Sequence, residues 1–340
     1  MPSSEFPFLQ WREDAWHALD FFPSSWLAPL SLGCVVVTTY PASLTSWAWH
    51  YHQVRLLSTL EKCFPTLEPQ AYPPWLVSCD GVLPIPPFFE GESESALTDK
   101  HYAVRLLGIP SAVHGGSLWR PPTIEGVSQA HEMVWIMQRR ELPLSSAPVS
   151  LKEVLWQRQG LLAPFKLGGT LLEGLWEQSV HSDTLMWVKP NGLAKKRIWL
   201  ETPTSSWFAL AWDVQAQCVV VLMPNATEDT HRLYSTSCAM IRLWVAQEVL
   251  ADRCFLQEVA TPLNREAHTL LYGVYLVNAL RGIQPVVSVT TLEGVEVSLP
   301  SSGEGTDAMH RACRTLIARL GHWWQHGVMG CEGDLTLSES

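Results

Sequence analysis

Apolar side chains follow a helical spacing in two long segments of the C-terminal half. Within residues 237–251, Ile241, Trp244 and Val245 fall on one side of a helix of about 3.6 residues per turn. Residues 308–324 repeat this spacing in a second segment. The pattern therefore predicts two amphipathic helices, each with one face packed on a core.

Shorter apolar runs predict the remaining elements. Runs rich in valine and other strand-forming residues predict strands over residues 32–38, 197–201, 207–212 and 218–223. Less regular apolar segments predict helices over residues 50–63, 131–141, 151–160, 170–180 and 269–280. Helices around a short mixed sheet in the C-terminal half describe an α+β domain.

A segment rich in proline and serine separates the two halves of the chain. Residues 142–150 hold two prolines and three serines, which predicts a domain boundary there. We expect a Trp- and Pro-rich N-terminal part over residues 1–148, without an assigned role. A second domain is expected over residues 149–330 and a flexible tail over residues 331–340.

Composition narrows the classes of function. The chain carries 33 acidic and 23 basic residues, for a net charge of −10, and a direct nucleic-acid binder usually has a basic surplus. Nucleic acid is therefore not an expected partner. The 17 tryptophans predict a thick aromatic core, because each indole covers a large area.

Cysteine usage and hydropathy indicate the compartment. The eight cysteines form no CxxC pair, and several lie in apolar runs, which is typical of reduced, buried thiols. The first 16 residues carry four charged side chains and predict no signal peptide. No apolar run is long enough to span a bilayer. We expect an intracellular protein, cytoplasmic or nuclear, without membrane contact.

The order of segments over residues 190–325 resembles the protease domain of the SUMO-protease family. Residues 206–213 look like the strand that a His-Trp pair opens in that family, and residues 218–223 are similar to the strand that follows. Pro262-Leu263-Asn264 is similar to the stretch before the Cys-Gly pair, and Tyr272-Gly273 looks like that pair. The resemblance implies a papain-like, adenain-like cysteine-protease fold in the C-terminal half.

The positions that match the family's catalytic residues hold other side chains. Ser206 stands at the His position, Met223 at the Asp position, Leu263 at the Gln position and Tyr272 at the Cys position. Without the imidazole and the thiol, the family's mechanism cannot operate at these positions. The resemblance therefore implies a pseudoenzyme that binds a protein partner, such as a ubiquitin-like modifier or a peptide. Its former cleft would be lined by Trp207, Trp212 and Tyr272.

Two other functions remain open. The first is an active cysteine protease with a relocated thiol, at Cys238 or Cys254; Cys238 begins a predicted helix, where the helix dipole lowers a thiol pKa. The second is a structural or assembly protein that self-associates through its tryptophans, so an oligomer stays possible.

Cofactor and metal signals are weak. No glycine-rich phosphate loop occurs, so no cofactor is predicted. His322 and His326 lie one helical turn apart near Cys313, but Cys313 belongs to the apolar face of the predicted helix. A packed helix therefore explains these residues better than a zinc site does, and no metal is predicted.

Overall fold

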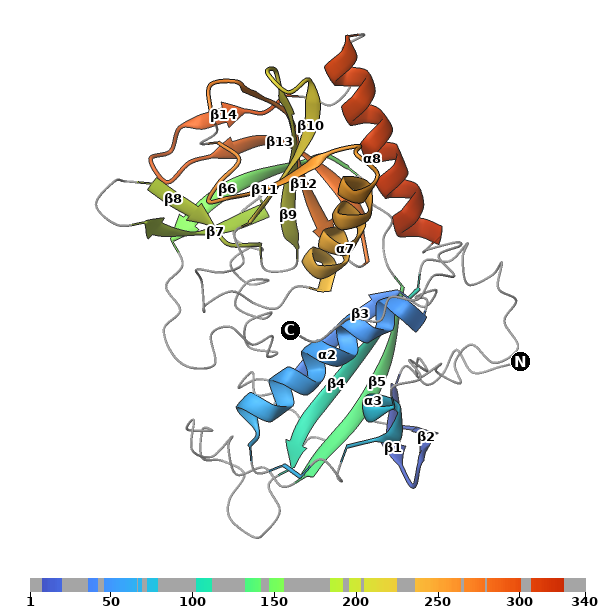
Figure 1. Ribbon diagram of the computed structural model, residues 1–340. Coiled ribbons are helices and arrows are strands. Elements are labelled where there is room, and N and C mark those ends of the chain that lie inside the picture. The colour runs from blue at the N-terminus through green and yellow to red at the C-terminus, as the bar shows by residue number, and fades with distance from the viewer. Residues whose placement is uncertain are drawn as a thin grey trace.

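The computed structural model describes the chain in segments. The described residues are 8–19, 36–41, 46–65, 67–68, 72–78, 102–111, 132–141, 147–155, 184–191, 196–202, 205–224, 236–263, 266–278, 280–300 and 307–326. They form two sheets with helices against each (Figure 1).

The first sheet is antiparallel and has five strands in the order β2-β1-β5-β4-β3. Its elements are β1 (Phe8–Arg12), β2 (Ala15–Ala18), β3 (Val36–Pro41), α2 (Ser46–Cys63), α3 (Pro74–Val77), β4 (Tyr102–Ser111) and β5 (Glu132–Glu141). Tryptophans fill the core of this part: Trp49, Trp75 and Trp135 are all buried in one cluster. Here the aromatic surplus serves packing, as the composition predicts.

The second sheet is mixed and curls on itself (Figure 1). Its elements are β6 (Val149–Leu155), β7 (Thr184–Asn191), β8 (Lys196–Trp199), β9 (Ser206–Asp213), β10 (Cys218–Pro224), α7 (Thr236–Leu250), β11 (Phe255–Val259), β12 (Thr269–Asn278), β13 (Gly282–Thr290), β14 (Glu296–Ser298) and α8 (Ala308–His326). The strand order is β11-β10-β9-β12-β13-β6-β7-β8, with β14 on β13. Strand β6 pairs in parallel with both β13 and β7.

The two faces of this sheet carry different cores. The inner face of the curl holds a cluster that includes Leu151, Met186 and Trp207. The outer face holds a cluster that includes Tyr272 and Trp212 and packs under α7 and α8. We call these the inner and outer faces. Because both faces are buried, the central strands are apolar on both sides.

Three segments predicted as helices are strands. Residues 131–141, 151–160 and 269–280 correspond to β5, β6 and β12 where the structure describes them. In β12, Tyr272 and Tyr275 point to the outer face and Val274 and Leu276 to the inner face. A strand buried on both sides loses its polar alternation, so its sequence looks like that of a buried helix. The predicted helix over residues 170–180 lies outside the described residues.

Other elements agree with the sequence. The helices over residues 50–63, 237–251 and 308–324 are α2, α7 and α8. The strands over residues 197–201, 207–212 and 218–223 are β8, β9 and β10. The strand over residues 32–38 overlaps β3, which starts at Val36.

The predicted cysteine-protease fold is wrong. That fold needs a buried helix beginning at Tyr272, and this residue lies in the middle of the strand β12, paired with β9 and β13. The boundary proposed near residue 148 remains a prediction, although the first sheet ends with β5 and the second begins with β6.

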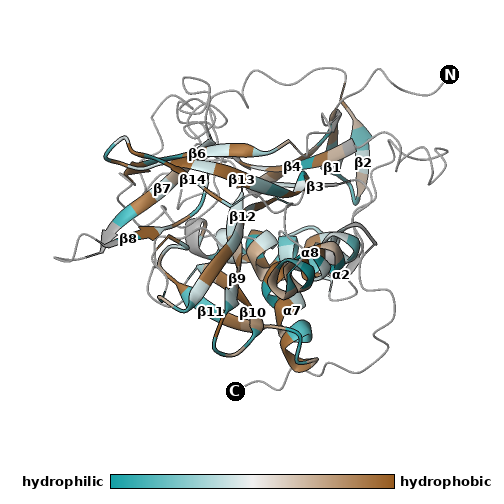
Figure 2. Cartoon of the chain, turned by 90° about the horizontal axis from the view of Figure 1, so that it is seen from above, coloured by the Kyte–Doolittle hydropathy of each residue, from teal (hydrophilic) through white to brown (hydrophobic). Residues whose placement is uncertain are grey.

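Helices link the two parts. Helix α2 of the first part contacts α7 of the second, and Figure 2 shows the two lying side by side. Tyr51 of α2 packs against the outer-face core. The two sheets are therefore joined through their helices.

Candidate functional site

Strand β6 carries two consecutive charged residues in the interior of the second sheet. Leu151 belongs to the inner-face core, so Glu153 also points to the inner face and Lys152 to the outer face. Register supports this assignment, since Lys152 pairs with Thr290 and Leu185, which lie outside the inner core. The strand thus places an amine on one face and a carboxylate on the other.

Lys152 is half-buried on a strand that has a neighbour on each side. Its ammonium forms no hydrogen bond or ion pair with another residue in the part of the chain that the structure describes. A partly desolvated charge without a partner is costly, so such a lysine usually has a chemical role.

Polar side chains surround Lys152 on the outer face. The Ser288 hydroxyl donates to the Ser150 hydroxyl at 2.9 Å, two residues along the register from the Lys152–Thr290 pair. The buried side chains of Leu185 and Trp187 lie on the same face of β7. The site therefore has hydroxyls on its β13 side and an apolar floor on its β7 side.

A β-bulge places Glu201 near this face. Leu200 N donates to Trp187 O at 2.9 Å, and Trp187 N donates to Glu201 O at 2.9 Å, so two residues stand opposite one. In regular register Glu201 would follow Trp199 onto the inner face. The bulge slips the alternation by one residue and directs Glu201 to the face of Trp187 and Lys152. The side chain is buried, with 5% of Glu201 exposed.

The segment after Glu201 is polar and buried. Thr202 closes a tight turn, with Thr202 N donating to Ser205 O at 3.0 Å and Ser205 N to Thr202 Oγ1 at 2.8 Å. Thr202, Ser205 and Ser206 are all buried. Buried hydroxyls next to a buried carboxylate are more typical of a binding site than of a core.

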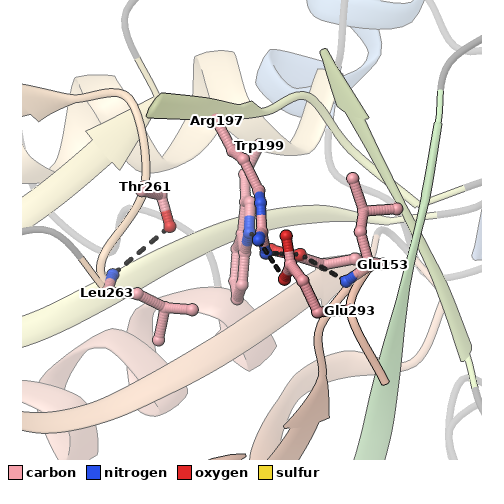
Figure 3. Close-up of polar contacts among 7 residues, drawn as sticks. Glu153, Arg197, Trp199, Thr261, Leu263 and Glu293 are labelled. Carbon is pink, nitrogen blue, oxygen red and sulfur yellow. Dashed lines mark hydrogen bonds and ion pairs between the residues drawn. The ribbon is translucent and has the colours of Figure 1, made fainter. Parts of the chain in front are cut away.

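Behind Lys152, Glu153 is the centre of a second polar group, which Figure 3 shows. Its carboxylate accepts the indole N–H of Trp199 at 2.6 Å and the amide N–H of Leu292 at 3.1 Å. Arg197 forms ion pairs with Glu153 and with Glu293. We call these five residues the Glu153 cluster.

The residues that the resemblance pointed to do not form one cleft. Trp207 lies in the inner core, whereas Trp212 and Tyr272 lie in the outer core on the opposite face. Ser206 and Met223 are buried in neighbouring parts of the sheet, and Leu263 packs at the edge of the inner core. Trp207, Trp212 and Tyr272 therefore serve as packing on two faces.

The alternative nucleophiles are placed in cores as well. Cys238, at the start of α7, is buried in the outer core. Burial raises the pKa of the Cys254 thiol to about 11, and the nearby charge of Glu248 adds to the effect. A raised pKa leaves the thiol protonated, which is the opposite of what a nucleophilic cysteine needs.

The zinc alternative finds no support in the described residues. Cys313 is fully buried in the outer core, and burial raises its thiol pKa to about 12. His310 bonds to Asp307 through Nδ1 at 2.8 Å. Within the described ranges, no group of three or more His, Cys, Asp or Glu residues could hold a metal ion. Cys331 lies outside those ranges.

Sequence reasoning missed Lys152, Glu153 and Glu201. A signal was present, because Lys152-Glu153 interrupts an apolar run of strand-forming length. The helix predicted over residues 151–160 hid the fact that Lys152 and Glu153 point to opposite faces of a strand. Among the helices that the structure describes, none is long and apolar enough to cross a membrane.

Comparisons by sequence give no match. No protein-family model matches the chain. No curated protein matches it either.

Comparisons by structure give matches over nearly the whole chain. The branched-chain amino acid aminotransferase of Thermobaculum terrenum in its PLP form has a TM-score of 0.62 at 12% identity, covering 94% of this chain and 95% of that one. The fold IV-transaminase CpuTA1 of Curtobacterium pusillum has a TM-score of 0.58 at 17% identity, covering 94% and 98%. A putative 4-amino-4-deoxychorismate lyase of Legionella pneumophila has a TM-score of 0.56 at 16% identity, covering 87% and 96%.

These matches overturn the resemblance to SUMO proteases. Both sheets are included in the matched length, whereas the protease resemblance covered only the C-terminal half. The interpretation as a pseudoprotease that binds ubiquitin-like modifiers loses its basis, and so do the relocated-thiol protease and the degenerate catalytic positions. The chain has the fold of the fold-IV transaminases.

Proposed function

We propose that this chain is a pyridoxal 5′-phosphate (PLP) enzyme that acts on the amino group of a small substrate. The observation that carries the proposal is that the half-buried amine of Lys152, which has no partner among the described residues, shares a sheet face with the buried carboxylate of Glu201 that a bulge turns there. The shared fold with a transaminase in its PLP form supports the same conclusion.

The residues on the outer face fit this cofactor. A PLP enzyme needs a lysine amine that condenses with the cofactor's aldehyde, losing one water, and a charged partner for the ring nitrogen. Lys152 supplies the amine and Glu201 the carboxylate. The buried hydroxyls of Thr236 and Ser237, at the start of α7 on the outer face, are candidates for the phosphate, which helix N-termini favour. This proposal replaces the expectation of no cofactor.

Each residue then has a defined task. PLP supplies an electron sink for charge that develops on the carbon next to the substrate nitrogen. Glu201 stabilises a proton on the ring nitrogen, because a buried carboxylate favours a cationic partner. Lys152 would hold the cofactor through its amine and would be placed to move a proton at that carbon. Leu185 and Trp187 exclude water from one side of the site.

The first test is where the cofactor attaches. Purified protein is incubated with PLP, reduced with borohydride and digested, and the modified peptide is identified by mass spectrometry. We expect the adduct on Lys152, and we expect Lys152→Ala to abolish it. Lys189→Ala is the matched control, because Lys189 is the other half-buried lysine on this sheet; it should keep the adduct. An adduct on another lysine, or none, would overturn the proposal.

The second test asks for the reaction. Amino acids with a keto-acid acceptor report amino-group transfer, and release of a small carbonyl product without an acceptor reports lyase activity. Lys152→Ala should lower either activity by at least about 1,000-fold, as removal of a covalent catalytic group usually does. Wild-type turnover that survives Lys152→Ala would show that the activity arises elsewhere.

A further inference from the structure

We infer that Glu153 is a positioning residue that fixes the strand of Lys152 relative to β8, the strand that directly precedes Glu201. The inference rests on the proposed function of these two residues. It concerns the inner face, opposite to the face that Lys152 occupies.

Glu153 joins two strands that lie on either side of β7. The sheet order is β6-β7-β8, so β7 separates the strand of Lys152 from β8. On the inner face Glu153 reaches across β7 and accepts hydrogen bonds from Arg197 and from Trp199 Nε1, both on β8. It therefore ties together two strands that do not pair directly.

These hydrogen bonds lie close along the chain to both Lys152 and Glu201. Lys152 is the residue before Glu153, and Glu201 is two residues after Trp199. The bulge at Leu200 and Glu201 begins directly after Trp199. Every contact that Glu153 makes with β8 thus lies within four residues of Glu201 along the chain. Figure 3 shows these contacts with Arg197 and Trp199.

The burial of Glu153 strengthens this link. The Glu153 side chain is 1% exposed, so its charge is sheltered from solvent and its hydrogen bonds are the charge-assisted kind. It also accepts from Leu292 N at 3.1 Å, which fixes the turn after β13. Removing one partner from such a group costs more than the bond itself, since buried donors are left without an acceptor.

Glu153→Gln is the informative change. The amide keeps the size and one acceptor oxygen, but its NH2 group must face a donor: Arg197, Trp199 Nε1 or Leu292 N. The link to β8 is weakened while the outer-face side chains stay chemically unchanged. A shift of the strands by a fraction of an ångström then separates the amine from the carboxylate.

A purely structural role makes a different prediction. Glu248→Gln is a matched control, because Glu248 is also buried and also pairs with arginine, here with Arg253 and Arg319, and it lies in the last turn of α7 rather than on the sheet. Both variants should lose thermal stability. Only a positioning residue should also change how Lys152 holds PLP.

The experiment measures two properties of the holoprotein. One is the dissociation constant of PLP, from fluorescence titration. The other is the midpoint of a pH titration followed by the near-visible absorbance of the lysine-bound cofactor. This midpoint depends on the distance between the bound amine and nearby charges. For Glu153→Gln we expect affinity to fall by about 10-fold or more, as small misplacements in a site do, and the midpoint to move. Glu248→Gln should leave both at wild-type values.

The outcomes are distinct. Wild-type affinity and midpoint in Glu153→Gln, with only a lower melting temperature, would overturn the positioning role and leave the proposed function standing. If wild-type protein gives no borohydride adduct on Lys152, the proposed function fails, and the positioning role fails with it. If Glu153→Gln does not fold, Trp199→Phe replaces it, since it removes the indole donor to Glu153 and keeps an aromatic ring in the inner core. The expected direction is the same, and wild-type values in that variant would overturn the inference.

Discussion

At the scale of single residues, close packing makes two glycines respond in opposite ways to one added methyl group. A Cβ on Gly108 in β4 would lie 2.9 Å from Met133 Cε and from a ring carbon of Trp135. A Cβ on Gly321 in α8 would have nothing within 4 Å. The first site is at the contact density of a core, and the second is open.

We therefore predict opposite changes in stability. Gly108→Ala should lower the free energy of unfolding by about 1–3 kcal/mol through overpacking. Gly321→Ala should raise it by roughly 0.5–1 kcal/mol, because alanine stabilises a helix interior relative to glycine. Urea denaturation of both variants measures these changes. A stabilised Gly108→Ala protein would contradict the packing of Met133 and Trp135 against β4.

The lysine and glutamates of the site could be recognised from sequence only in part. Lys152 and Glu153 stand out as charges within an apolar run. Glu201 does not, because its direction depends on a bulge opposite Trp187, and the side-chain alternation of β8 alone would turn it to the inner face. Local sequence carries no information on which residue a partner strand will oppose.

At the scale of elements, the amphipathic helices were predictable and the central strands were not. Helix α8 keeps a polar face, so its period is visible, whereas α7 is buried or half-buried over most of its length. Strand β12 is covered on both sides, and its apolar run fits either a helix or a strand. Strand β6 carries charges on both faces, which a short segment does not distinguish from a helix. The predicted protease fold rested on taking β12 as a helix.

One ionic group holds the two helices together at this scale. Glu248 of α7 accepts from Arg319 Nη2 of α8 at 2.9 Å and pairs with Arg253. Burial alone would raise the pKa of Glu248, but the hydrogen bonds from the two arginines and their charges hold that pKa below its ordinary value. The carboxylate therefore binds protons less readily in the folded than in the unfolded protein.

The sign of the pH dependence follows. A lowered folded pKa contributes stability above the unfolded pKa, and this contribution is lost as pH falls through the folded value. Near neutral pH, Glu248→Gln should cost about 1–2 kcal/mol, allowing for the half-exposed arginines. As pH falls below the ordinary range of a carboxyl pKa, the difference from wild type should shrink. Chemical denaturation across pH measures this, and a constant difference would contradict the assignment.

At the scale of the whole molecule, two sheets are joined through helices. Helix α2 packs on the first sheet through residues such as Leu57 and contacts α7. Tyr51 on the same helix packs against the outer-face core of the second sheet. A single helix thus contributes to two cores.

We predict that two substitutions on α2 destabilise different parts of the molecule. Tyr51→Ala should increase amide hydrogen exchange in α7, because it removes a contact between the parts, with a loss of about 1–2 kcal/mol. Leu57→Ala is the control; it should increase exchange in β3 and β4 and leave α7 unchanged. Peptide-resolved exchange by mass spectrometry distinguishes them. Equal protection of α7 in wild type and Tyr51→Ala would show that the contact carries no stability.

The bulge at Leu200 and Glu201 also shifts by one residue the alternation of side chains between the two faces of the sheet. Before the bulge, every second side chain of β8 points to the inner face. After the bulge, the side chains that continue this alternation point to the opposite face. Deleting one residue there would restore the regular phase and turn the carboxylate into the apolar interior of the curl, with every side chain still present. The position of the carboxylate thus depends on the number of residues in one short segment. A change in the length of this segment would harm the site more than most substitutions would.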